Sequence, residues 1–541
     1  METGQSSIAL GALPAAGIIL VSVFLTVILK RIASWIRPAG PLPYPPGPKP
    51  KPIVGNMFDI PTSNMIQEYV RWGDKYKSKI LHASSLGNHV VILNSLEDAE
   101  ELLDRRASNY SNRMELPMVK LLGFHTNMVF MPYGAEWRQH RRVAQQIFRP
   151  DAITRQEPIQ ARRVHLLLKG LLDDPDNFLA HHKVLALSIP LEYMYGYNTQ
   201  TLDDPFIIQA QKAMDLGLDY FRPNSTLINL FPILGHLPPW FPGATAKKAA
   251  ATTREILHKL ETEPMDMVEQ AMKKGIPTPC VLSEFLDSKR DSPTFEEEAQ
   301  IMKRLALAIY SGASDTMVAS LGALFYLLAT RPDIQKKAQA EVDGVLKTGD
   351  GSTSPTTRRT MRLPDFGDRA AMPYTEALMR ELWRYWPTAP MGAPHCALGE
   401  DEYRGWYIPR GAVVLPNIWA MTRDEGMYPD PHEFKPERFL DERGRLLDGA
   451  SSRVLAFGFG RRICPGRYSA SSTLWLTIAS VLACFDISKA KDAEGNEIEV
   501  DDGFVFQSIT LRKTPFKCTI TPRFEGVRKL VEEAVAVERV Q

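Results

Sequence analysis

The stretch Phe457-Gly-Phe-Gly-Arg-Arg-Ile-Cys-Pro-Gly466 surrounds one cysteine, Cys464, with glycines and arginines, directly before an apolar helical run from Tyr468 to Phe485. A cysteine that binds a metal as thiolate needs a lowered pKa, donors to its sulfur and a backbone that can wrap around it. Gly458, Gly460 and Gly466 are expected to supply unusual backbone conformations, and a helix N-terminus offers unpaired N–H groups and positive potential. Arg462, two residues before the cysteine, is placed to reach a carboxylate on a cofactor that contains the metal. The stretch therefore predicts a metal-ligating cysteine rather than an inert buried one.

The bulk composition agrees with a large globular protein. The chain has 541 residues, of which 44% are hydrophobic and 23% charged, as in ordinary domains. A formal net charge of +1 argues against nucleic acid as the main partner. The five cysteines are odd in number and scattered without a C-x-x-C pair, which excludes a disulfide framework or zinc site and fits a reducing compartment. They are Cys280, Cys396, Cys464, Cys484 and Cys518.

Residues 1–30 are predicted to form an N-terminal transmembrane anchor. From Ile8 to Leu29 no residue is charged, and about 22 residues at roughly 1.5 Å rise would span a bilayer core. Lys30 and Arg31 follow at once, so the positive-inside rule places the C-terminal side in the cytosol. A cleaved signal peptide is the alternative, but the apolar stretch is long and its basic residues lie on the wrong side.

Residues 31–52 are predicted to form a basic and proline-rich linker, because proline at this density favours an extended, semi-rigid spacer. Residues 53–541 are predicted to be one large, mainly α domain with a minor β region. Helical periodicity dominates from about Met65 to Trp386, whereas Val90–Leu93 and Ala412–Leu415 are expected strands. The apolar segment Phe231–Gly243 is either a buried loop or a monotopic membrane contact.

A second informative stretch runs from Ala306 to Ser320, where small residues, an acid and hydroxyls interrupt an apolar helical run. A threonine in mid-helix can bond back to a carbonyl and bend the helix, which opens room for a ligand or water. An acid and an alcohol together can pass protons to a group bound beside the helix. Without the cysteine stretch, a buried and locally satisfied threonine is an equal alternative.

The cysteine stretch fills every fixed position of the cytochrome P-450 signature F-x-x-G-x-R-x-C-x-G. The matching residues are Phe457, Gly460, Arg462, Cys464 and Gly466. The chain therefore resembles this family, and other family motifs follow in the right order along nearly its whole length. The resemblance implies a P-450 fold and haem b with the Cys464 thiolate as axial ligand, which favours O–O cleavage. Phe457 and Arg462 are implied to bind the same cofactor.

The stretch Gly312-Ala-Ser-Asp-Thr316 resembles the family motif A/G-G-x-D/E-T. The resemblance implies that Thr316 steadies the oxygen intermediate and that Asp315 relays protons. One departure is Ala313, which stands where the family usually has a second glycine. Because Gly312 keeps the first small residue, a groove is still expected, although its shape differs.

Two further motifs imply structural and cofactor-binding roles. Trp137-Arg-Gln-His-Arg141 resembles W-x-x-x-R, whose Trp137 and Arg141 would hold a haem propionate together with Arg462 and His395. Glu381-Leu-Trp-Arg384 resembles the buried E-x-x-R pair, which Arg438 of Pro436-Glu-Arg-Phe439 would complete as a folding triad. The neighbouring Glu376 and Arg380 are expected to be an ordinary surface pair. Three arginines near these motifs are either solvated or dock an acidic electron donor: Arg138, Arg142 and Arg461.

The expected reaction is insertion of one oxygen atom from O2 into a lipophilic small molecule. About 75 residues follow Gly466, too few for flavin domains, so electrons are expected from an NADPH-cytochrome reductase, with a small haem protein as a second donor. Two alternatives are an isomerase or dehydratase of the same family that needs no external electrons, and a non-catalytic haem protein for electron transfer or sensing. The acid–threonine pair and the absence of C-x-x-C-H argue against them.

Location and substrate follow from the anchor and from the resemblance. The chain is expected in the endoplasmic reticulum membrane, in contact with lipid, as a single-pass protein with a cytosolic catalytic domain. Asn417–Asp424 and Tyr403–Pro409 resemble fungal microsomal members of secondary metabolism, of the O-methylsterigmatocystin oxidoreductase type, which favours a terpenoid or polyketide-derived substrate. The implied pocket walls are mixed aliphatic and aromatic, and so only lipophilic: Met114–Val129, Phe206–Leu230, Leu305–Ala313, Ala389–Ala393 and Phe504–Phe506.

Overall fold

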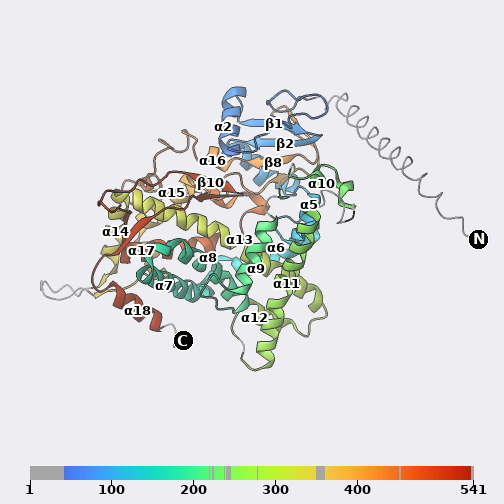
Figure 1. Cartoon of the computed structure of the whole chain (residues 1–541). Helices are drawn as coiled ribbons and strands as arrows, with labels where there is room; N and C mark the ends of the chain where they lie inside the picture. Colours follow the sequence, from blue (N-terminus) through green and yellow to red (C-terminus); the bar gives the residue numbers. More distant parts are fainter. Residues whose placement is uncertain are drawn as a thin grey trace, which may run out of the picture. The chain divides into compact units, whose positions relative to one another are not determined.

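A computed structural model describes residues 42–217, 220–221, 225–236, 238, 245–276, 278–348, 360–449, 453–507 and 509–537. The predicted membrane anchor and the first part of the predicted linker lie outside these residues. The chain divides into two compact units (Figure 1). One comprises Met1–Asn112 with Pro394–Asn417, and the other Arg113–Ala393 with Ile418–Gln541.

The first unit contains a four-stranded sheet in the order β1-β2-β8-β5. β2 pairs antiparallel with β1 and parallel with β8, where Val90 lies opposite Val413. Both strands expected from the sequence are therefore confirmed, and they are direct neighbours. The bounds are β1 (Ile80–Ser85), β2 (Asn88–Leu93), β5 (His395–Cys396), β6 (Asp401–Tyr403), β7 (Trp406–Ile408), β8 (Val413–Pro416), α2 (Met65–Tyr76), α3 (Leu96–Ala99) and α4 (Ala107–Tyr110).

The described part of the proline-rich stretch lies along β1 of this sheet. The His82 amide donates a hydrogen bond of 2.9 Å to the carbonyl of Pro46. The Tyr44 ring stacks on the His82 ring at 4.4 Å, and His82 Nε2 lies 3.0 Å from His89 Nδ1. A Cβ added to Gly47 would stand 1.9 Å from the His82 carbonyl oxygen. This part of the stretch is therefore packed against the sheet and is no free spacer.

The second unit is mainly helical with small sheets, as the sequence predicts. Its helices are α5 (Pro117–Leu122), α6 (Ala135–Phe148), α7 (Glu157–Asp173), α8 (Phe178–Tyr195), α9 (Pro205–Gly217), α10 (Leu227–Leu230), α11 (Thr245–Lys273), α12 (Val281–Lys289), α13 (Phe295–Thr330), α14 (Pro332–Leu346), α15 (Pro373–Tyr385), α16 (Ile418–Met421), α17 (Arg467–Cys484) and α18 (Val527–Val537). Its strands are β3 (Lys347–Thr348), β4 (Thr360–Met361), β9 (Phe485–Lys489), β10 (Phe504–Gln507), β11 (Thr510–Lys513) and β12 (Cys518–Pro522), paired as β3-β4, β10-β11 and β12-β9.

The long helix α13 runs through the core of the second unit. It contacts α8, α17, α6 and α11, and side chains of its C-terminal half, such as Leu324, Phe325 and Leu328, are fully buried. By length and composition it is the one helix among the described residues that could cross a membrane. Because 56% of that apolar window is buried by protein, its hydrophobicity is that of a core helix.

The apolar segment Phe231–Gly243 is described only in part. Pro232–His236 forms a short 3-10 helix, whereas residues 237 and 239–243 lie outside the described residues. Phe231 is 39% exposed and Ile233 67%. The described half is therefore not the buried loop that was one of the two expectations.

Candidate functional site

Cys464 differs from the other four cysteines in its exposure. Cys280, Cys396, Cys484 and Cys518 are buried, whereas Cys464 is partly exposed. Its loop is closed by a hydrogen bond of 2.9 Å from the Cys464 amide to the Phe457 carbonyl. The sulfur is therefore presented on a fixed loop, where a bound group can reach it.

The glycines of the loop act in two different ways. Gly458 and Gly460 have φ angles of +75° and +57°, which side chains rarely adopt. The expectation of an unusual backbone is wrong for Gly466, whose φ of −79° is ordinary. Gly466 instead caps α17, and its amide donates a hydrogen bond to the Cys464 sulfur.

The surroundings of the sulfur act on its pKa in opposite directions. Burial raises the pKa of the Cys464 thiol, whereas the Gly466 amide, Arg141 and Arg467 lower it. The net shift is upward, so the protein alone does not supply the lowered pKa that the sequence interpretation required. A coordinated metal ion deprotonates a thiol directly. The loop therefore fits a sulfur that becomes a thiolate when it binds metal.

Arginines gather beside the cysteine loop. Arg462 donates hydrogen bonds of 3.1 and 2.8 Å to the carbonyls of Met128 and Met131, and its guanidinium lies 4.3 Å from the Trp137 ring centroid. Burial, Arg113 and Arg141 lower the pKa of Arg462 to about 8. Mutual repulsion of buried cations is costly unless an anion joins them.

Arg141 has a buried donor atom that an anionic group could satisfy. Its Nε is buried and has no hydrogen-bond partner among the described residues, although nearly all buried polar groups are hydrogen-bonded in native structures. Burial also lowers the pKa of Arg141, while the nearby Cys464 raises it. A cofactor with carboxylates on one edge and a metal for Cys464 would satisfy both groups, so the residues fit haem.

His395 belongs to the first unit, on β5. It is 4% exposed, and its Nδ1 lies 2.7 Å from the Tyr110 carbonyl oxygen of the same unit. This hydrogen bond fixes the orientation of the ring on β5. Its role as a propionate partner stays a prediction.

On α13, Thr316 Oγ1 donates a hydrogen bond of 2.9 Å to the Gly312 carbonyl, which is the expected bond back to the helix. A Cβ added to Gly312 would meet no atom within 4 Å. The space expected beside this turn is therefore present, although Ala313 follows in place of a second glycine.

Asp315 does not stand alone on the same helix. Its Oδ2 lies 2.6 Å from Nη2 of Arg512 on β11, and both side chains are about one third exposed. Sequence reasoning missed Arg512, because only the neighbouring residues Phe504–Phe506 were assigned to the pocket by resemblance. No local pattern signals an ion pair between residues so far apart in the chain.

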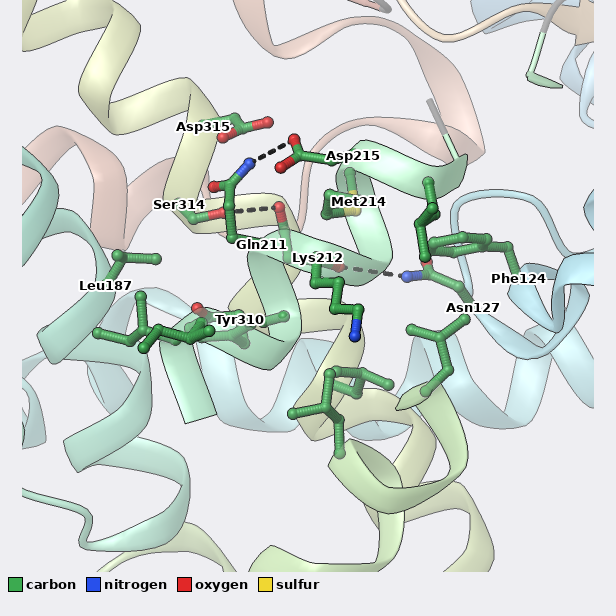
Figure 2. Close-up of a pocket in the computed structure, with 18 of the residues that line it drawn as sticks. Phe124, Asn127, Leu187, Gln211, Lys212, Met214, Asp215, Tyr310, Ser314 and Asp315 are labelled. Atoms are coloured by element: carbon green, nitrogen blue, oxygen red, sulfur yellow. Dashed lines mark hydrogen bonds between the residues drawn. The ribbon is translucent and has the colours of Figure 1, made fainter. Parts of the chain in front are cut away.

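A cavity of about 630 Å³ lies beside α13. Figure 2 shows Gln211 of α9 hydrogen-bonded to Asp215. The Gln211 amide donates to the Asp215 carboxylate at 2.7 Å, and the Asn127 amide donates to Ser311 Oγ at 3.3 Å. The α13 residues that line the cavity recur every three or four positions and so share one helix face: Arg304, Leu307, Tyr310, Ser311, Ser314, Asp315 and Val318. Gly312 and Thr316 do not line it, and they lie on a different face.

The predicted pocket walls match this cavity only in part. Segments of Met114–Val129, Phe206–Leu230 and Leu305–Ala313 line it, but Ala389–Ala393 and Phe504–Phe506 do not. The expectation of a purely lipophilic lining does not describe this cavity, because charged residues from several elements border it. They are Lys183, Lys212, Asp215, Glu261, Arg304, Asp315 and Arg512.

The E-x-x-R motif forms a buried network on α15. Arg384 Nε and Nη2 bind Glu381 at 2.6 and 2.8 Å, and Arg438 Nε binds Glu381 at 3.0 Å. The side chains are 0% (Glu381), 2% (Arg384) and 8% (Arg438) exposed. Each arginine also donates to backbone carbonyls, so one carboxylate organises the segment that contains Arg438.

The neighbouring pair on α15 is not the surface pair that was expected. The Glu376 side chain is only 8% exposed and binds Arg380 at 3.0 Å and Arg369 at 2.7 Å. Arg369 also donates to Ser471 Oγ of α17. The expectation was wrong because helical spacing reveals the pair but not the α17 packing that buries it.

Comparison with known proteins gives the same family over most of the chain. The family model described as Cytochrome P450 matches residues 45–515, which include parts of both compact units. "Cytochrome P450 monooxygenase ple1" of Rhodocybe pseudopiperita is 36% identical over 90% of this chain and 91% of its own length. "Cytochrome P450 monooxygenase COX2" of Coprinopsis cinerea is 36% identical over 91% of both chains. "Cytochrome P450 monooxygenase claR" of Ampulloclitocybe clavipes is 35% identical over 90% and 88%.

Proposed function

The chain belongs to the cytochrome P450 family and is a monooxygenase, and from this premise we propose that it oxidises a lipophilic small molecule with O2 at a haem held by Cys464. The observation that carries the proposal is the cysteine loop. It contains a partly exposed cysteine whose sulfur accepts a hydrogen bond from the Gly466 amide, next to Arg141, whose buried Nε has no partner among the described residues.

Haem b is proposed to be held by Cys464 at the iron and by Trp137, Arg141, Arg462 and His395 at its propionates. When bound, haem with an axial thiolate supplies dioxygen binding and O–O bond cleavage. Phe457 belongs to the same loop as the ligand and lies at its opposite end. The protein thus contributes binding, orientation and electrostatics, as proteins do for other cofactors.

Thr316 and Asp315 are proposed to move protons. Thr316 Oγ1 is held by the Gly312 carbonyl, so its hydroxyl has a fixed position on the face of α13 that contains Gly312. Asp315 borders the 630 Å³ cavity on another face, where it can exchange protons with solvent. An acid reached by water, one residue from an oriented alcohol, is an arrangement that can deliver protons to a buried reaction.

Electrons are proposed to come from an NADPH-cytochrome reductase, with a small haem protein as a second donor. Arg138, Arg142 and Arg461 are exposed, and Arg461 donates a hydrogen bond to Tyr133 beside the cysteine loop. An exposed cationic surface attracts acidic partners and speeds their association.

The enzyme is proposed to be a single-pass protein of the endoplasmic reticulum membrane with a cytosolic catalytic domain. The apolar stretch at 8–29 with basic residues directly after it supports this placement. Residues 1–30 would be the anchor, and the catalytic domain would extend from residue 53 to 541. A lipophilic substrate would be dissolved in the same membrane.

The substrate is proposed to be a fungal secondary metabolite, a terpenoid or a polyketide. The relatives named above come from fungi and are monooxygenases, and apolar side chains such as Phe124, Ile207 and Met214 line part of the cavity beside α13. Product profiling after co-expression with a reductase identifies the compound that is consumed.

A carbon monoxide difference spectrum of the reduced protein tests the ligand. The spectrum is expected to have the Soret band of a thiolate-ligated haem, and Cys464→Ser is expected to lose it. Cys280→Ser is the matched control and is expected to keep it. An unchanged band in Cys464→Ser would contradict the assignment. Turnover without NADPH and reductase would instead favour the isomerase or dehydratase alternative.

A further inference from the structure

Trp383 connects two parts of the site that lie far apart in the sequence. It occupies a variable position of the Glu381–Arg384 motif, and its ring packs edge-to-face on Phe457 with centroids 4.9 Å apart and planes at 74°. Its Nε1 donates a hydrogen bond of 3.2 Å to Ser320 Oγ on α13. One side chain of α15 therefore contacts both the cysteine loop and α13.

Ser320 continues this connection toward Thr316. Ser320 Oγ donates a hydrogen bond of 3.1 Å to the Thr316 carbonyl, and Thr316 Oγ1 donates to the Gly312 carbonyl. Because Gly312, Thr316 and Ser320 are each four residues apart, they follow one face of α13. The hydroxyls thus form two consecutive bonds along that face, and Trp383 contacts its C-terminal end.

The connection lies in a water-poor part of the core. Ser320 is 5% exposed and Trp383 4%. Hydrogen bonds in such surroundings are stronger than in water, and a buried donor left without its acceptor costs most of its desolvation free energy. Trp383 is thus held in one orientation by Ser320, and that orientation sets the edge it presents to Phe457.

We propose that Trp383 and Ser320 are positioning residues that couple the cysteine loop to the turn of α13 that contains Thr316. The proposal rests on the proposed function, because it assumes haem between these two elements. Trp383 touches Phe457 at one end of the connection, and Ser320 touches Thr316 at the other. A change at either residue therefore alters both sides of the haem.

The test uses the full-length holoenzyme and carbon monoxide as the probe. The Soret position of the CO complex reports on the thiolate side, and the rate of CO rebinding after photolysis reports on the side of Thr316. Ser320→Ala is expected to shift the Soret band, and Trp383→Phe is expected to change the rebinding rate about threefold to tenfold, which corresponds to one buried hydrogen bond. Ser320→Thr returns a hydroxyl and is expected to restore both readouts.

Trp475→Phe is the matched control. Trp475 is a fully buried tryptophan of the same core cluster, but its Nε1 has no hydrogen-bond partner among the described residues. It is expected to leave the Soret position and the rebinding rate unchanged. If Trp475→Phe moves both readouts as far as Trp383→Phe does, general core damage explains the effect and the proposal is overturned.

Thermal unfolding of the four members of a double-mutant cycle supplies a readout apart from haem chemistry. Trp383→Phe and Ser320→Ala are expected to lower the melting temperature by less together than the sum of their separate effects, because they remove one shared bond. Additive shifts would overturn the proposal. A wild-type protein without a thiolate-type CO band would instead contradict the proposed function itself.

Discussion

Arg512 Nη2 lies 2.6 Å from Asp315 Oδ2, so the proposed proton-relay acid of α13 is ion-paired to a strand of the β10-β11 hairpin. The pair borders the cavity beside α13. Each partner is about one third exposed, so the pair contributes little to stability. The ion pair instead fixes the position of the Asp315 carboxylate at the cavity.

Replacement of Arg512 should therefore alter proton delivery more than stability. Arg512→Met is expected to lower product formed per NADPH consumed by about threefold to tenfold, which is less than the roughly 10²–10⁴-fold of a proton-transfer group itself, because Arg512 would act only through Asp315. Arg512→Lys keeps the charge and should retain most of the coupling. The measurement is product and hydrogen peroxide per NADPH with reductase. Because Arg512 would act through Asp315, Arg512→Met should add nothing in an Asp315→Asn background, and additive losses would contradict this role.

The buried network around Glu381 should govern folding. Glu381→Gln leaves Arg384 and Arg438 buried without their counter-charge and is expected to lower the free energy of unfolding by about 3–5 kcal/mol. Urea unfolding followed by circular dichroism measures this change. The control is Glu437→Gln in the same segment, where the pair with Lys337 is half exposed (51% and 55%) and a loss below about 1 kcal/mol is expected. Equal losses in the two variants would refute the buried-network interpretation.

The stability of the protein should fall in mild acid because of His82. Burial, with a smaller contribution from His89, lowers the pKa of His82 to about 3, compared with about 6.5 in an unfolded chain. Only the unfolded state then takes up a proton between these values. The contribution of His82 to the free energy of unfolding is thus complete above pH 6.5, and it falls toward pH 3 by up to about 1.4 kcal/mol per pH unit.

His82→Phe tests this linkage and retains an aromatic ring for Tyr44 to stack upon. Unfolding free energies in urea at pH 7.5 and pH 5 should differ less in His82→Phe than in the wild type. The same slope in His82→Phe and the wild type would assign the acid sensitivity to other groups.

Gly47 should tolerate no side chain. A Cβ there would stand 1.9 Å from the His82 carbonyl oxygen, which belongs to the backbone of β1 and cannot move aside. Gly47→Ala is expected to lower the free energy of unfolding by about 1–3 kcal/mol or more. Gly344→Ala on α14 is the control, because a Cβ there meets nothing within 4 Å and alanine favours a helix by about 0.5–1 kcal/mol. Comparable melting temperatures for the two variants would contradict this prediction.

Local sequence predicted those features whose causes are local. The helix after Cys464, the strands around Val90 and Val413 and the bond from Thr316 to Gly312 follow from periodicity and side-chain chemistry. The family signature predicted the identity of the cofactor, which local sequence patterns alone do not indicate. The proposed role of Cys464 thus depends on both kinds of information.

Long-range packing accounts for what the sequence did not reveal. Arg512 reaches Asp315 only because β11 packs on α13, and Trp383 meets Phe457 only because α15 packs behind the cysteine loop. Glu376 was misjudged because its second partner, Arg369, lies outside α15 and is itself held by Ser471 of α17, about 95 positions after Glu376 in the chain. Such contacts depend on the tertiary arrangement, and spacing within one helix carries no information about them.

The packing of Tyr44 and Gly47 against β1 has a consequence for how the enzyme would search its membrane. Because the chain packs against the sheet from about residue 42, only about 11 residues connect this unit to the proposed anchor. A connection of that length spans at most about 40 Å. Diffusion would then be confined to a layer next to the bilayer, where both a lipid-dissolved substrate and a membrane-bound reductase are concentrated. Encounters would be set by surface density rather than by bulk concentration.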